Sequence, residues 1–103
     1  MTQAIDQEVV RNRIKSQIKY WKKKFLIVGE DLKNVMGELA RVRVTIKLNN
    51  EITQDGFDWY AKILDELNAD LSFLLSKQTN INLVIESLEK DLKLTYETGV
   101  NND

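Results

Sequence analysis

Ten apolar residues in the first half of the chain follow one another at alternating spacings of four and three, without a polar interruption. They are Ile14, Ile18, Trp21, Phe25, Val28, Leu32, Val35, Leu39, Val42 and Ile46. A repeat of about 3.5 residues places all of them along one stripe of an α-helix, which is the heptad seam of a helix that packs against another helix. The lysines between residues 15 and 24 fall outside this stripe, where a helix meets water.

The second half of the chain carries a similar seam, in which Gln78 is the one polar member. Its residues are Phe57, Tyr60, Leu64, Leu67, Leu71, Leu74, Gln78, Ile81, Ile85, Leu88 and Leu92. The segment between the seams, NNEITQDG at 49–56, holds turn-forming residues, and either Thr53 or Asp55 is a candidate N-cap for the helix that follows. Because a short loop makes consecutive helices antiparallel neighbours, we expect Gln78 to face the region from Leu26 to Gly29.

These patterns predict an all-α protein, a long antiparallel helical hairpin of the coiled-coil type that forms a single domain over residues 1–103. We expect a helix over about 4–49, a loop over about 50–54, a second helix over about 55–97, and a frayed tail over 98–103. The chain has no proline and only 4 glycines, a composition typical of helices. Gly29 leaves an alternative open, in which the segment VGED separates two helices of a three-helix bundle. The heptad phase runs through Gly29 unchanged, which favours a continuous helix.

The apolar residues outside the seams exceed what a two-helix hairpin can bury. We expect them to form an oligomer interface, at Met36, Ala40, Val44, Leu48, Phe73 and Leu75. A helix that is apolar on two sides is usually covered on both. The pattern therefore predicts a homo-oligomer, with a dimer of hairpins in a four-helix bundle favoured, and a heterologous protein partner as the alternative.

Charge divides unevenly between the two halves of the chain. Residues 1–50 hold 11 Lys+Arg and 5 Asp+Glu, a net charge of +6, whereas residues 51–103 hold 4 and 11, a net charge of −7. The favoured interpretation is that the opposite charges set the register of the hairpin, with Lys15 near Glu89. The alternative is a polyanion contact on a basic face. That face would comprise Arg11, Arg13, Lys15, Lys19, Lys22, Lys23 and Lys24.

Catalytic and metal-binding patterns are missing from the sequence. There is no histidine and no cysteine, the serines have no base beside them, and no glycine-rich phosphate loop occurs. The acidic pairs Glu66/Asp70 and Glu86/Glu89 are more typical of solvated helix edges than of a metal site. The sequence therefore predicts a protein that is not an enzyme and that has no cofactor and no metal.

The longest apolar run, residues 25–28, is far shorter than the roughly 20 residues of a membrane span, and the first residues contain no apolar signal region. We therefore expect no membrane contact and a cytoplasmic location. The function predicted from these observations is a non-enzymatic protein–protein interaction or assembly module, such as a scaffold, an adaptor or a small inhibitor. The alternative function is a nucleic-acid-binding accessory protein that uses the basic face from Arg11 to Lys24.

Overall fold

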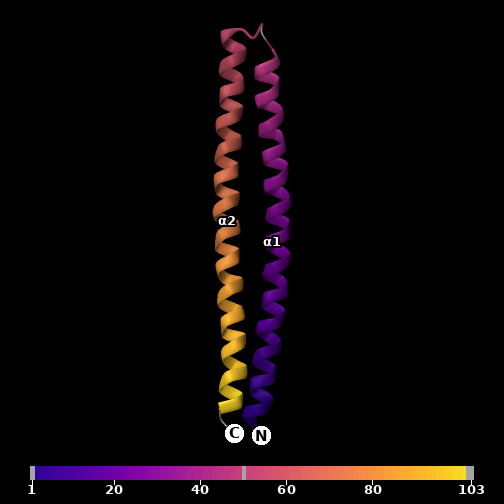
Figure 1. The fold of residues 1–103 in the computed structure, drawn as a ribbon, viewed down its shortest axis with the longest axis vertical. Coiled ribbons are helices and arrows are strands. Elements are labelled where there is room, and N and C mark those ends of the chain that lie inside the picture. Colours follow the sequence, from indigo (N-terminus) through magenta and orange to yellow (C-terminus); the bar gives the residue numbers. More distant parts are fainter. Residues whose placement is uncertain (1, 50, 102–103) are drawn as a thin grey trace. The chain divides into compact units, whose positions relative to one another are not determined.

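Two long helices, α1 (Thr2–Leu48) and α2 (Gln54–Asn101), make up the computed structural model (Figure 1). It describes residues 2–49 and 51–101, and the side chains of residues 6–49 and 51–97. No strand occurs within these residues. The prediction of an all-α antiparallel helical hairpin is confirmed. The helix α1 passes through Gly29 without a break. The helix α2 continues to Asn101, so residues 98–101 of the expected frayed tail are helical, and residues 102–103 lie outside the described part.

The chain divides into two compact units. The hairpin unit, residues 27–78, contains the second part of α1, the loop and the first part of α2. The terminal unit, residues 1–26 and 79–103, contains the beginning of α1 and the end of α2. The two helices are antiparallel in the terminal unit, where Arg11 bonds to Thr95 and Lys22 pairs with Glu89.

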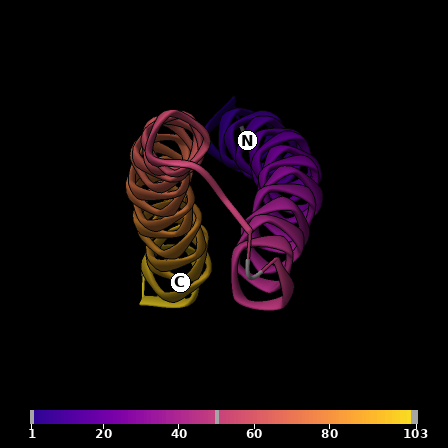
Figure 2. The same cartoon turned by 90° about the horizontal axis from the view of Figure 1, so that it is seen from above.

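Polar side chains at the two helix ends position the loop of the hairpin unit. The Asn49 N–H donates to the carbonyl oxygen of Thr45 at 3.1 Å, and the Asn49 side-chain oxygen accepts the Glu51 N–H at 3.2 Å. The Thr53 hydroxyl oxygen accepts the N–H of Gly56 at 3.2 Å, which is the bond of an N-cap residue. Of the two predicted caps, Thr53 is therefore the one that forms. Figure 2, which looks onto this end, shows the chain passing from α1 to α2.

The two predicted seams form the contact between the helices. All ten seam residues of α1 are buried or half-buried, and so are those of α2 except Phe57, which is 51% exposed. Phe57 lies in the first turn of α2, opposite the place where α1 has ended, so less of the partner helix is available to cover it. The core residues are Ile18, Val28, Leu32, Leu39, Leu67, Ile81 and Ile85. Even the best covered of these, Val28 and Leu39, keep 3% of their surface exposed, because each helix has only one neighbour.

The polar seam residue Gln78 lies against Gly29 inside the hairpin unit, as predicted. A Cβ atom placed on Gly29 would lie 3.8 Å from the Gln78 Nε2 atom. Both residues are half-buried. Among the described residues, no side-chain nitrogen or oxygen is buried without a hydrogen-bond partner, and the Gln78 amide is no exception. The glycine thus leaves room for a polar side chain in an otherwise apolar seam.

Candidate functional site

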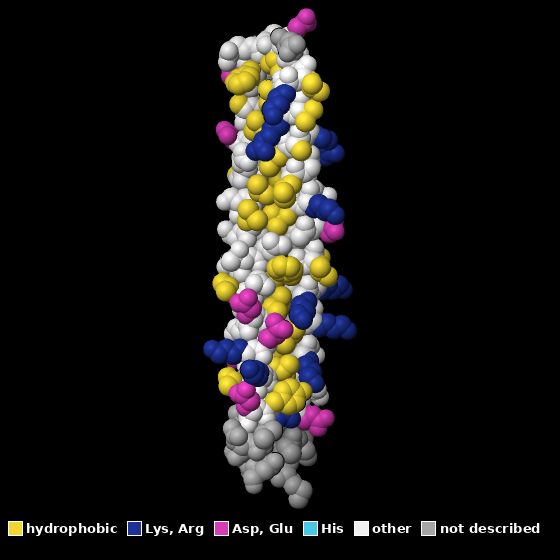
Figure 3. Space-filling model, in the orientation of Figure 1, with side chains coloured by type: hydrophobic (Ala, Val, Ile, Leu, Met, Phe, Trp, Pro, Cys, Tyr) yellow, Lys and Arg dark blue, Asp and Glu magenta, His cyan; other side chains and the backbone are white. Residues whose placement is uncertain are grey.

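The hairpin unit exposes a line of apolar side chains on α1. This apolar stripe consists of Met36, Ala40, Val44 and Leu48, which are all exposed. The exposed fraction is 58% for Met36, 51% for Val44 and 77% for Leu48. A spacing of four residues advances about 40° around a helix at each step, so the stripe starts beside the seam at Met36 and moves across the outer surface of α1. Figure 3 shows apolar side chains reaching the surface on the face that it draws.

The predicted interface residues of α2 lie on two different sides of the helix pair. Phe73 and Leu75 are 67% and 49% exposed, and residues two apart point about 200° apart on a helix. Phe73 lines an open depression of about 320 Å³ together with Asn34 and Asp70. Met36 comes two residues after Asn34 and so lies on the opposite side, together with Leu75. The structure therefore brings Met36 and Leu75 to the same side and places Phe73 on the other.

Exposed aromatic surface near the loop is a feature that the sequence pattern did not assign to an interface. Phe57 is 51% exposed, and Trp59 is 59% exposed and packs edge-to-face on Tyr60, with ring centroids 5.0 Å apart. The seam spacing predicted a buried Phe57, since periodicity alone does not reveal where the opposing helix ends. The hairpin unit therefore exposes apolar side chains near the loop as well as along the apolar stripe.

Several cations of the predicted basic face are held by contacts within the terminal unit. The Arg11 guanidinium donates to the Thr95 carbonyl oxygen at 2.9 Å and lies 4.3 Å from the centre of the Tyr96 ring. The Lys15 ammonium lies 5.7 Å from the same ring centre. The Lys22 ammonium lies 3.9 Å from a carboxylate oxygen of Glu89. The ion pair of Glu89 is therefore with Lys22, while Lys15 contacts Tyr96 and lines the same groove as Glu89.

Five of the seven cations lie within an arc of about 120° around α1, and the other two, Arg13 and Lys24, point away from that arc. The five are Arg11, Lys15, Lys19, Lys22 and Lys23. Successive residues of a helix point about 100° apart, so Lys22, Lys23 and Lys24 point in three directions. Lys24 lies over the ring of Tyr20, 5.4 Å from its centre. Arg13, Lys19 and Lys23 are exposed. The polyanion contact at these cations stays a prediction.

Tyr96 has the clearest electrostatic perturbation in the terminal unit. A hydrogen bond with the Lys15 side chain lowers the pKa of the Tyr96 phenol, and the positive charges of Lys15 and Arg11 lower it further, while partial burial opposes them. The phenol is 43% exposed, so it lies at the surface. Sequence reasoning missed this cluster because it depends on the register between α1 and α2.

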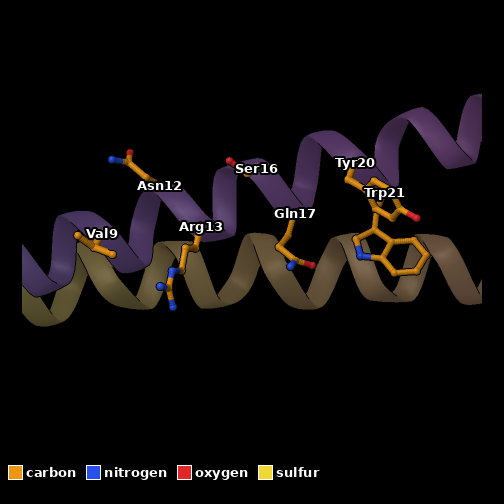
Figure 4. A pocket seen from close by; sticks show the side chains of 7 residues that line it. All are labelled: Val9, Asn12, Arg13, Ser16, Gln17, Tyr20 and Trp21. Atoms are coloured by element: carbon orange, nitrogen blue, oxygen red, sulfur yellow. The ribbon is translucent and has the colours of Figure 1, made fainter.

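The outer surface of α1 in the terminal unit carries an open depression of about 670 Å³, drawn in Figure 4. Its lining comes entirely from α1: Val9, Asn12, Arg13, Ser16, Gln17, Tyr20 and Trp21. Tyr20 and Trp21 pack edge-to-face, with ring centroids 5.3 Å apart. No carboxylate is among the described residues that line this depression beside Ser16.

The described residues contain neither a cluster of metal ligands nor a membrane-spanning stretch. Within this part of the chain, no group of three or more histidine, cysteine or acidic side chains is placed to hold a metal ion. Neither helix, over the same residues, contains a stretch long and apolar enough to cross a membrane. Comparison with protein-family models, with curated proteins and with solved structures found no match to this chain.

Proposed function

We propose that this protein is a non-enzymatic protein–protein interaction or assembly module that self-associates through the apolar stripe of the hairpin unit. The dimer would pair two hairpins in a four-helix bundle. The observation that carries the proposal is the exposure of Met36, Val44 and Leu48, which are 58%, 51% and 77% exposed on a helix whose seam is already occupied. A cytoplasmic location is part of the proposal and accords with the absence of cysteine, and cell fractionation tests it.

The thinness of the core also supports self-association. Each helix of the hairpin unit has one neighbour, so burial within one chain is restricted to the seam. A second hairpin packed over Met36 and Leu75 would cover the sides of the seam that remain half-buried. Four-helix bundles are built in this way, from pairs of antiparallel helices with short loops.

Val44→Glu tests the proposal, because Val44 lies in the stripe and outside the seam. Fully burying a valine side chain contributes roughly 1.5–3 kcal/mol. Val44 is 51% exposed in each of the two chains that form a dimer, so the two residues together account for about this amount, and its loss weakens association by about 10- to 100-fold. We expect light scattering after size exclusion to give the wild-type chain about twice its monomer mass of 12.0 kDa at micromolar concentration, and Val44→Glu a mass near that of the monomer. Circular dichroism should show unchanged helix content.

Ser87→Glu is the matched control, because it adds the same charge at an exposed α2 position of the terminal unit. It should leave the mass of the oligomer unchanged. A wild-type mass that stays at the monomer value as concentration rises would refute self-association. Equal dissociation by Ser87→Glu would show that added charge, rather than loss of apolar contact, separates the chains.

A further inference from the structure

The terminal unit contains an open groove of about 450 Å³ between α1 and α2. Its apolar floor is formed by Ile18, which is buried, and Leu92, which is half-buried. Lys15 and Lys22 line it on α1, and Glu89, Lys93 and Tyr96 line it on α2. Figure 3 shows basic and apolar side chains close together on the face drawn of the terminal unit. The groove thus combines an apolar floor with cationic walls contributed by both helices.

The charges of the groove are weakly neutralised. Three lysines and one glutamate line it, which leaves a net charge of +2. The Lys22–Glu89 pair is 3.9 Å long, and both side chains are more than half exposed. The Lys93–Glu97 pair is 4.0 Å long and also exposed. Exposed pairs of this kind contribute about 0–1 kcal/mol each, so they can be exchanged for contacts with a ligand at little cost.

We propose that this groove binds an acidic amphipathic helix of a partner protein, with apolar side chains on Ile18 and Leu92 and carboxylates beside Lys15 and Lys22. Recognition of one apolar helix face in a groove between two helices is a common mode of binding. The proposal concerns the terminal unit and does not depend on self-association of the hairpin unit.

The spacing of the lysines matches such a helix. Lys15 and Lys22 are seven residues apart on α1, which corresponds to roughly 10.5 Å along the helix axis. Carboxylates seven residues apart on a partner helix lying along the groove have the same spacing and point in the same direction. The Tyr96 phenol, whose O–H can donate to a carboxylate, stands beside Lys15 at one end of the groove.

Glu89 favours a peptide over nucleic acid or an anionic membrane. This carboxylate lines the groove beside Lys22, where it repels an unbroken row of phosphates. A peptide can avoid that repulsion, since it can place a neutral or basic side chain next to Glu89. Complementary charges across an interface contribute more to the choice of partner than to the affinity of binding.

The test uses the full chain and a fluorescein-labelled synthetic helix of about three heptads, with leucine at the core positions, glutamate at flanking positions seven residues apart and glutamine at the other flanking positions. A second peptide has lysine in place of each glutamate. Fluorescence anisotropy should show saturable binding of the glutamate peptide, with the lysine peptide at least about tenfold weaker. Single-stranded RNA and vesicles containing phosphatidylserine are tested in the same buffer, and both should bind more weakly than the glutamate peptide.

Lys15→Glu and Lys23→Glu form a matched pair of variants. Both reverse one exposed charge on α1, but only Lys15 lines the groove. Lys15→Glu should weaken binding of the glutamate peptide by about tenfold, and Lys23→Glu by less than about threefold. Thermal unfolding followed by circular dichroism confirms that each variant is folded. The proposal is overturned if the glutamate peptide does not bind, if both variants weaken it equally, or if RNA or vesicles bind more tightly.

Discussion

Gly29→Ala should stabilise the protein, although this glycine lies in the seam region against Gln78. Gly29 is an interior residue of α1, and none of the described glycines has a positive φ, so alanine can adopt its backbone conformation. The new methyl group would lie 3.8 Å from the Gln78 Nε2 atom, an ordinary van der Waals distance. There is therefore no steric cost to set against the gain in helix propensity.

The magnitude follows from that propensity. Glycine in a helix interior is about 1 kcal/mol less favourable than alanine, so Gly29→Ala should raise the free energy of unfolding by about this amount. For a domain of about 100 residues, this corresponds to a rise in Tm of about 4–8 °C. The assay is thermal and urea unfolding followed by circular dichroism. All variants are compared at one protein concentration, because association would shift the apparent stability.

Gly37→Ala is the control for this experiment. Gly37 is exposed on the same helix, and a Cβ atom there would meet no other atom within 4 Å, so the substitution reports helix propensity alone. The two variants should gain similar stability. If Gly37→Ala stabilises the chain and Gly29→Ala destabilises it, then the contact between Gly29 and Gln78 is tighter than 3.8 Å allows, and the reasoning is refuted.

Two further predictions concern polar groups at the contact between the helices. Gln78→Leu should raise the free energy of unfolding by about 1 kcal/mol, because leucine adds apolar contact at a half-buried position of an otherwise apolar seam, and it should broaden the distribution of oligomers seen by light scattering. A clear fall in Tm would contradict this prediction. Tyr96 should ionise at lower pH in the folded protein than in denaturant, as followed by tyrosinate absorbance, and Lys15→Met should remove most of that difference, since Lys15 is the largest cause of the lowered pKa. A lowered folded-state pKa stabilises the fold above the ordinary tyrosine pKa of about 10, and this contribution is lost as pH falls through the lowered value. If Lys15→Met leaves the ionisation of Tyr96 unchanged, the contact between Lys15 and Tyr96 is ruled out as its cause.

The sequence by itself determined the helices and the seam. Burial in a helix pair recurs every 3.5 residues, and that period is written in the order of the residues, so the positions from Ile14 to Ile46 could be assigned without knowledge of the partner helix. The continuity of α1 through Gly29 followed from the same phase. The turn-forming composition of residues 49–56 located the loop. The sequence left two candidates for the N-cap of α2, Thr53 and Asp55.

The tertiary structure decided how the two helices face each other. A helix position fixes the direction of a side chain relative to its own axis, whereas its neighbour on the other helix depends on where the loop turns. For that reason Lys22, rather than Lys15, pairs with Glu89, and Lys15 contacts Tyr96. The antiparallel orientation of the helices decides which residues share a side, and it places Phe73 beside Asn34 rather than beside Met36. Exposed ion pairs such as Lys22–Glu89 contribute only about 0–1 kcal/mol, so the charges of the sequence by themselves do not identify which residues pair.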